Sequence, residues 1–121
     1  MIARALFWAA LVSVFPMTRH AVDAQGTYTV LGAGGDSCGR WLELRRSTDP
    51  ANGLRSTIEV EWVEGYISAY NLYVWNFTDV GAGTDVDALK AWIDSYCQAN
   101  PLERVHGAAQ ELIKTLRQRQ H

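Results

Sequence analysis

The sequence predicts an all-α protein: a small four-helix bundle that is stapled by one disulfide and preceded by a flexible N-terminal arm. Apolar residues recur at steps of three and four along successive segments, the period of helices with one buried face. The chain has two cysteines, Cys38 and Cys97. Its 121 residues suit a single domain. We divide the chain into a signal peptide at 1–24, an arm at 25–35 and a helical domain at 36–121.

The N-terminal segment has the pattern of a secretory signal peptide. Arg4 supplies the positive start, residues 5–15 are an apolar run, and Pro16 ends it. Small residues at Val22 and Ala24 predict cleavage after Ala24. The alternative is a membrane anchor, but a spanning helix needs about 20 apolar residues, more than this run contains. We therefore expect a periplasmic or secreted protein that leaves the membrane after cleavage near Ala24.

The arm at 25–35, QGTYTVLGAGG, is rich in glycine and has no helical period, so we expect a flexible linker. Its GAGG segment superficially resembles a phosphate-binding loop. A dinucleotide fingerprint would need another glycine where Ser37 stands, and no P-loop lysine follows. We expect no cofactor.

The first helix is predicted from residue 36, where Asp36 or Ser37 can cap it. Residues 47–54, STDPANGL, combine Pro50 with an Asn-Gly pair and predict a loop.

The second helix is predicted over 56–77 and has the broadest apolar face, which is typical of the central helix of a bundle. Gly65 and Ala69 lie one turn apart within it, and we expect a neighbouring helix to approach closely there. The predicted stripe consists of Ile58, Trp62, Tyr66, Ala69, Tyr73 and Phe77, widened by Val63, Ile67, Tyr70 and Val74.

A turn is predicted at 78–83, after which Thr84 can cap the third helix and Asp87 can complete a capping box. Asn100 is expected to end that helix and to start the fourth, with Pro101 at the first helical position. The third helix would bury Leu89, Trp92, Ile93 and Tyr96, and the fourth Leu102, Val105, Ala109, Leu112 and Leu116.

The predicted core is aromatic, and its main members would be Trp41, Trp62, Tyr66, Trp92 and Tyr96. The two cysteines, Cys38 and Cys97, would staple it, since an exported chain meets an oxidising compartment. Closing a loop of about 60 residues contributes on the order of 4 kcal/mol in the chain-entropy model. The alternative is a reactive thiol. It is less favoured because the chain has no Cys-x-x-Cys pair and no basic cluster beside either cysteine.

The sequence contains no convincing catalytic or metal-binding pattern, so we expect a protein that is not an enzyme and holds no metal. His106 lies beside the apolar seam of the fourth helix and is expected to be exposed, without a partner serine or cysteine. Turn and cap carboxylates explain Asp79, Asp85 and Asp87 better than a calcium loop. A solvated helix face explains Glu59, Glu61 and Glu64 better than a hydrolytic pair. The formal net charge of −2 gives no reason to expect nucleic acid binding.

Three segments carry a family resemblance: SCGRWLEL at 37–44, WVEGYISAYN at 62–71 and WIDSYCQANPLERV at 92–105. Together with the two distant cysteines, they resemble the HdeA/HdeB-type periplasmic acid-stress chaperones. The resemblance implies a folded dimer at neutral pH that loosens when acid protonates its carboxylates and then holds unfolding clients on apolar surface. The helix at 62–71 with a late cysteine is also similar to exported immunity proteins that neutralise peptidoglycan-attacking effectors of type VI secretion.

The sequence thus yields two hypotheses, both of a small, exported, non-enzymatic binding protein. The first is a periplasmic HdeA-like protein that acts as a stress chaperone and forms a homodimer. The alternative is an immunity protein that inhibits one cognate effector by binding it. In both cases the partner is another protein.

Overall fold

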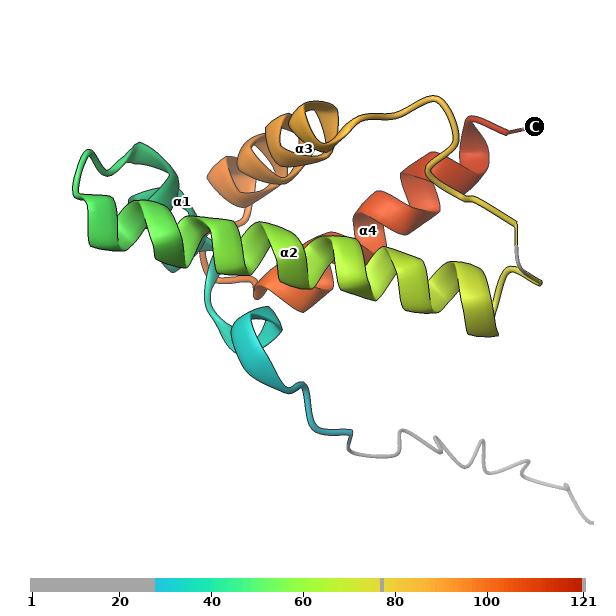
Figure 1. The fold of residues 1–121 in the computed structure, drawn as a ribbon, viewed down its shortest axis with the longest axis horizontal. Helices are drawn as coiled ribbons and strands as arrows, with labels where there is room; N and C mark the ends of the chain where they lie inside the picture. The colour runs from blue at the N-terminus through green and yellow to red at the C-terminus, as the bar shows by residue number, and fades with distance from the viewer. Residues whose placement is uncertain (1–27, 77, 121) are drawn as a thin grey trace, which may run out of the picture.

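The computed structural model describes residues 28–76 and 78–120. It consists of a short 3-10 helix, η1 (Gly32–Gly35), and the helices α1 (Cys38–Arg46), α2 (Pro50–Tyr73), α3 (Val86–Ala99) and α4 (Val105–Gln118) (Figure 1). The predicted all-α bundle is confirmed, and no strand longer than a single bridge occurs in these two ranges. The predicted signal peptide and its cleavage site at Ala24 lie outside the described residues.

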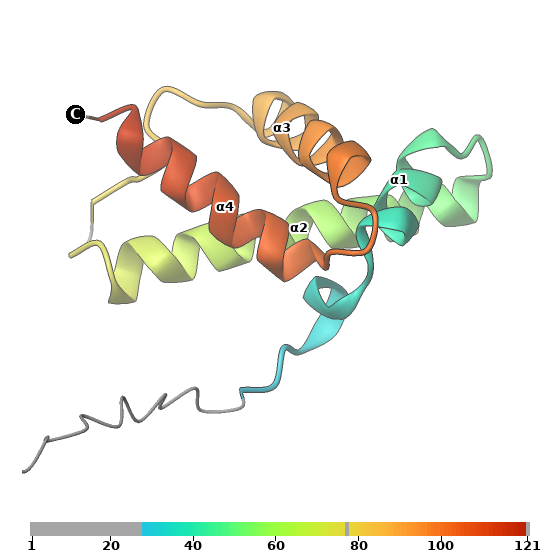
Figure 2. The same ribbon diagram turned by 180° about the vertical axis from the view of Figure 1, so that it is seen from behind.

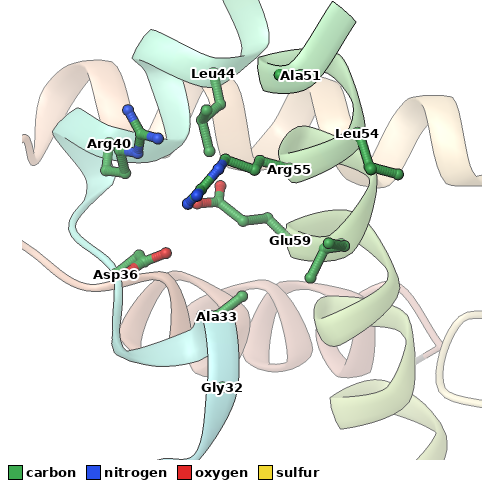
Figure 3. Close-up of a pocket in the computed structure, with 10 residues that line it drawn as sticks. Gly32, Ala33, Asp36, Arg40, Leu44, Ala51, Leu54, Arg55 and Glu59 are labelled. Atoms are coloured by element: carbon green, nitrogen blue, oxygen red, sulfur yellow. The ribbon is translucent and has the colours of Figure 1, made fainter.

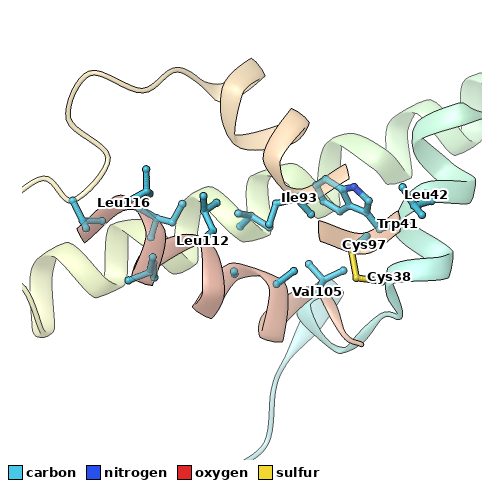
Figure 4. Close-up of a cluster of buried hydrophobic side chains, with 14 residues drawn as sticks. Cys38, Trp41, Leu42, Ile93, Cys97, Val105, Leu112 and Leu116 are labelled. Carbon is cyan, nitrogen blue, oxygen red and sulfur yellow. A yellow bond between two sulfur atoms is a disulfide. The ribbon is translucent and has the colours of Figure 1, made fainter. Parts of the chain in front are cut away.

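The longest helix, α2, runs the length of the domain, and α4 crosses it obliquely in both views (Figures 1 and 2). α1 packs against both α2 and α3, while α4 packs against α2, α3 and η1. These faces meet in one cluster around Trp41, Ile93 and Leu112 (Figure 4). The core is therefore built mainly from aliphatic side chains of α4, which pack against Val63 and Ile67 of α2 and Ile93 of α3, and α1 closes it at one end.

The expected aromatic core is only partly correct. Trp41 is buried, with 1% of its surface exposed. The other four aromatic residues are half-buried and pack around the core as two stacked pairs, Trp62 with Tyr66 and Trp92 with Tyr96, with ring centroids 5.2 and 5.4 Å apart. Each pair is spaced i, i+4 along its helix, so the two rings lie over the same helix edge. They cover the core and do not fill it.

The second helix begins earlier than predicted, within the segment that was expected to be a loop. Asp49 caps α2, its carboxylate accepting the N–H of Ala51 at 2.8 Å, and Pro50 occupies the first helical turn. Proline is favoured there because its missing N–H needs no partner. α2 also ends before the predicted residue 77, at Tyr73, and Asn76 then takes a positive φ of 50°.

The face that α2 buries also differs from the predicted stripe. The buried positions are Ser56, Glu59, Val63 and Ile67, whereas Ile58, Tyr73 and Val74 are 54%, 81% and 61% exposed. Gly65 and Ala69, predicted to receive a neighbouring helix, are exposed, and a Cβ added at Gly65 would meet nothing within 4 Å. The prediction failed because apolar residues occupy most of the circumference of this helix.

Helix α3 is capped by Asp85 and not by the predicted Thr84. The Asp85 carboxylate accepts the N–H of Ala88 at 2.8 Å. The stripe predicted for this helix holds in part, because Ile93 is buried whereas Leu89, Trp92 and Tyr96 are half-buried against the core.

The fourth helix begins at Val105, so the predicted start at Asn100 and Pro101 is wrong. Asn100 is the C-cap of α3, and the segment after it pairs with the residues before α1. The N–H of Cys38 donates to the carbonyl of Glu103 at 2.8 Å, and the N–H of Val105 donates to that of Asp36 at 2.9 Å. This antiparallel pairing holds the backbone extended at Arg104, the N-cap of α4, and so overrides the helix-start preference of Pro101. Leu102 is consequently 96% exposed and lies outside the seam.

The predicted bridge between Cys38 and Cys97 is confirmed, with Cα atoms 4.8 Å apart. Both cysteines are fully buried, and the bond joins the start of α1 to the last turn of α3 (Figure 4). Because the sequence has two cysteines and both are bonded, the reactive-thiol alternative is wrong. The disulfide is compatible with an oxidising extracellular compartment.

The part of the predicted arm that the structure describes is anchored to the bundle. Trp62 donates its ring N–H to the carbonyl of Leu31 at 2.8 Å, and Gly34 is buried beneath the same ring. A Cβ added at Gly34 would lie 2.1 Å from Cζ2 of Trp62. Glycine is therefore required there for close packing. The sequence alone did not distinguish this role from that of a flexible glycine-rich linker.

Candidate functional site

A pocket of about 620 Å³ lies between η1, α1 and the first half of α2 (Figure 3). Its apolar wall comes from Ala33, Leu44, Ala51, Leu54 and Ile58, and its charged groups are Asp36, Arg40, Arg55 and Glu59. The volume is within the range of about 300–1,000 Å³ that is usual for ligand sites. The pocket exists because α2 starts at Pro50, which extends the helix past α1.

Glu59 is the unusual residue of this pocket. It is 1% exposed, and neither of its carboxylate oxygens has a hydrogen-bond partner among the described residues. The expectation that Glu59 belongs to a solvated face is therefore wrong. It stands in the inward row of α2 between Ser56 and Val63, at the spacing of three and four that marks one helix face.

Burial and a neighbouring acid both act on the titration of Glu59. Loss of hydration raises the pKa of its carboxyl from 4.5 to about 7, and the neighbouring Asp36 carboxyl adds to the shift. Arg40 lowers the pKa by a smaller amount. Asp36 can accept a hydrogen bond from Glu59 only when Glu59 is protonated, so the ionised form has no donor to satisfy it.

The neighbours of Glu59 are held by the fold. Asp36 has its backbone fixed from both sides, since its N–H donates to Ala33 at 3.0 Å and its carbonyl accepts from Val105. Arg40 is engaged by Glu43 of α1 at 2.9 Å. Figure 3 shows the side chains of Arg55 and Glu59 extending from α2 toward α1. The pocket thus places two acids and two guanidinium groups beside an apolar wall.

A second polar cluster joins α1 to α3 away from the pocket. The ring N–H of Trp41 donates to Asp94 at 2.7 Å, and Arg45 binds both oxygens of the same carboxylate at 3.1 Å. Every group in this cluster has a partner, which indicates a structural role. The sequence prediction missed the pair, although a buried tryptophan N–H normally requires an acceptor.

The remaining predicted chemistry-bearing residues do not join the pocket. His106 is half-buried and not exposed as predicted, with Nδ1 3.2 Å from the carbonyl of Gly34. Asp79 accepts from the N–H of Gly81 at 2.8 Å in its turn, Asp85 caps α3, and Asp87 pairs with Lys90, as expected for turn and cap carboxylates. Within the described ranges, no three His, Cys, Asp or Glu side chains gather as metal ligands would.

Large apolar side chains are exposed in two places that matter for binding. Leu54 and Ile58, which we call the pocket rim, are 65% and 54% exposed and line the pocket. Leu72, Tyr73 and Val74, which we call the α2 tip, are 43%, 81% and 61% exposed at the other end of that helix. Contiguous exposed apolar surface is typical of contact sites for other molecules.

Among the helices that the structure describes, none has the length and apolar character to span a bilayer. Comparison with known proteins found no match to any family model, curated protein or solved structure.

Proposed function

We propose that this chain is a non-enzymatic, exported protein that binds another protein, and that the partner docks over the pocket and its rim. The observation that carries the proposal is the pairing of exposed Leu54 and Ile58 with a buried, unpaired acid, Glu59. Exposed aliphatic side chains supply apolar contact, and a polar group beneath them supplies specificity.

Binding accounts for this pocket better than catalysis does. The described residues that line it include no serine, cysteine, histidine or lysine, so the pocket lacks the hydroxyl, thiol and amine nucleophiles and a histidine base. Its charged groups, carboxylates and guanidinium groups, are the ones that recognise charged partners.

Export is proposed on two features of the chain. One is the signal-peptide pattern at 1–24, and the other is the buried bridge between Cys38 and Cys97. We expect a periplasmic or secreted product beginning near Gln25. Mass spectrometry of the protein made in a bacterial host tests this, and an uncleaved product in the cytoplasm would contradict it.

Both protein classes that the sequence resembles remain as proposals. The α2 tip favours a chaperone of the HdeA type, because Tyr73 and Val74 offer apolar surface to a client. The pocket favours an immunity protein, because an enclosed acid suits one cognate side chain better than many clients. The raised pKa of Glu59 also favours the second class, since its protonation in acid removes a buried charge and so favours the closed fold.

One experiment separates the two classes. The purified, oxidised protein is tested for suppression of client aggregation from pH 7 to pH 2, and a strain producing it is challenged with a peptidoglycan-attacking effector. Client protection in acid supports the chaperone, and survival of the challenged strain supports the immunity protein. A chain that does neither contradicts the proposal.

Variants of the pocket rim locate the surface. Leu54→Asp and Ile58→Asp should abolish whichever activity is found, while Leu102→Asp, at a residue 96% exposed on the connection between α3 and α4, should preserve it. Retained activity in both rim variants would show that the partner docks elsewhere. Sedimentation of the same proteins tests the proposed homodimer.

A further inference from the structure

We infer that the pocket beside Glu59 is a binding site for an alkylammonium group, a positively charged nitrogen on an apolar stem. A lysine side chain of the protein partner carries this group, and so does a free primary amine. The inference deepens the proposed function and rests on it for the identity of the partner.

The buried carboxylate of Glu59 lacks hydrogen-bond donors from the residues that the structure describes. Glu59 has both oxygens enclosed and without donors in the described part of the chain. Burying a carboxylate is costly unless a positive charge and hydrogen-bond donors accompany it. An ammonium group supplies both, since it has three N–H donors and no acceptor.

The lining also determines the sign of the charge that the pocket accepts. Asp36 contributes a second carboxylate to the same lining, and Arg40 is engaged by Glu43 at 2.9 Å. An anionic guest would face both acids, whereas a cation is attracted to both. Arg55 is exposed and extends from α2 to the pocket lining without a hydrogen bond or ion pair to Glu59 (Figure 3).

The pocket also offers an apolar surface to the hydrocarbon stem of the alkylammonium group. Leu44 is 3% exposed and, with Ala51, forms an apolar wall that continues to the pocket rim at Leu54 and Ile58. A four-carbon chain running along this wall would remove part of its methylene surface from water, which favours binding. The arrangement of apolar wall and buried acid therefore offers one contact to the methylene stem of a lysine side chain and another to its ammonium group.

The test measures binding of n-butylammonium to the oxidised protein by NMR titration at pH 8 and at pH 5. The amine stays charged at both values, while Glu59 changes from ionised to protonated. We expect shifts centred on the pocket and an affinity at least about tenfold lower at pH 5. Butyrate and butan-1-ol should bind at least about tenfold more weakly at pH 8.

Glu59→Gln should reduce the affinity at pH 8 to the value measured at pH 5. It keeps the shape of the side chain without its charge, and it should fold because it removes a buried ionisable group. Glu61→Gln, an exposed acid on the same helix, is the matched control and should leave the affinity unchanged. Equal affinity in Glu59→Gln, equal binding of butyrate, or no binding of the amine would each overturn the inference.

A lysine-containing peptide and its acetylated form distinguish the two sources of the group. Loss of peptide binding on acetylation supports a partner lysine, whereas binding of butylammonium without the peptide supports a free amine. If the amine fails to bind while Ile58→Asp still abolishes partner activity, this inference falls and the proposed function stands. If the amine binds while the rim variants keep full activity, the proposed docking surface is the part that fails.

Discussion

The indole ring of Trp62 lies against Gly34 so closely that a Cβ added there would be 2.1 Å from Cζ2 of the ring. This contact fastens η1 onto α2 and so forms one wall of the Glu59 pocket. Gly34→Ala should therefore destabilise the fold by about 1–3 kcal/mol, the usual cost of overpacking. Urea unfolding measures the change.

Gly35→Ala is the control for this prediction, because a Cβ at Gly35 meets nothing within 4 Å. The free energy of unfolding should change much less in this variant. Equal destabilisation by the two substitutions would show that the loss comes from the backbone of η1 and not from the ring contact.

Glu59 should make the protein less stable as the pH rises toward and past neutrality. Its pKa is about 7 in the folded chain and 4.5 as a free side chain, so the folded state binds the proton more tightly. Its stabilising contribution is complete below pH 4.5 and is lost as the pH rises through 7, amounting to up to about 3 kcal/mol. Glu59→Gln should remove this dependence and stabilise the protein at pH 8.

Unfolding free energies of wild type, Glu59→Gln and Glu61→Gln between pH 4 and pH 8 measure this effect. Wild type and Glu61→Gln should share one profile, with Glu59→Gln diverging from them above pH 5. Parallel profiles for all three proteins would mean that Glu59 titrates as an ordinary exposed acid.

Asp94 should be the most important acid for the attachment of α1 to α3. Asp94→Ala leaves the ring N–H of buried Trp41 without its acceptor and frees Arg45, at a cost of about 1–3 kcal/mol. Asp87→Ala removes an exposed pair with Lys90 and the acid in the first turn of α3, and it should destabilise the protein much less than Asp94→Ala does. Chemical denaturation followed by tryptophan fluorescence compares the two, and an equal effect would contradict the structural role of Asp94.

The bridge between Cys38 and Cys97 should contribute on the order of 4 kcal/mol, since it closes a loop with a sequence separation of 59. Reduction, or replacement of both cysteines by alanine, should lower the melting temperature substantially. Intact mass with and without reductant checks that the bond forms, and two free thiols in the exported protein would contradict it.

The sequence predicted those features that depend on local residue pattern and on the number of cysteines. Two cysteines allow one bridge, and the helical period predicted helices near α1, α2, α3 and α4. The start of α4 was missed because it depends on pairing between residues 36–38 and 103–105, which are distant in the sequence. Nothing near Pro101 signals that pairing.

The candidate site was missed for a different reason. Ile58 and Glu59 are neighbours on a helix that is apolar around most of its circumference, so the period alone did not select which of them faces the core. Packing of α1 and η1 against α2 makes that selection and places Glu59 inside. The row of Ser56, Glu59, Val63 and Ile67 at steps of three and four was the available signal.

The disulfide encloses α1, α2 and α3 within one covalent ring, whereas α4 lies beyond Cys97 and η1 lies before Cys38. These two outer segments are paired with each other through Asp36 and Val105, and they are held on the ring by packing and by hydrogen bonds such as Cys38 to Glu103 and Trp62 to Leu31. Partial opening of the molecule thus has a preferred seam: η1, which buries one residue, can come away from the ring before α4, which buries six. Amide hydrogens of η1 would then exchange ahead of those in α3 and α4, and the wall of the Glu59 pocket that η1 forms would be the first part of the molecule to yield.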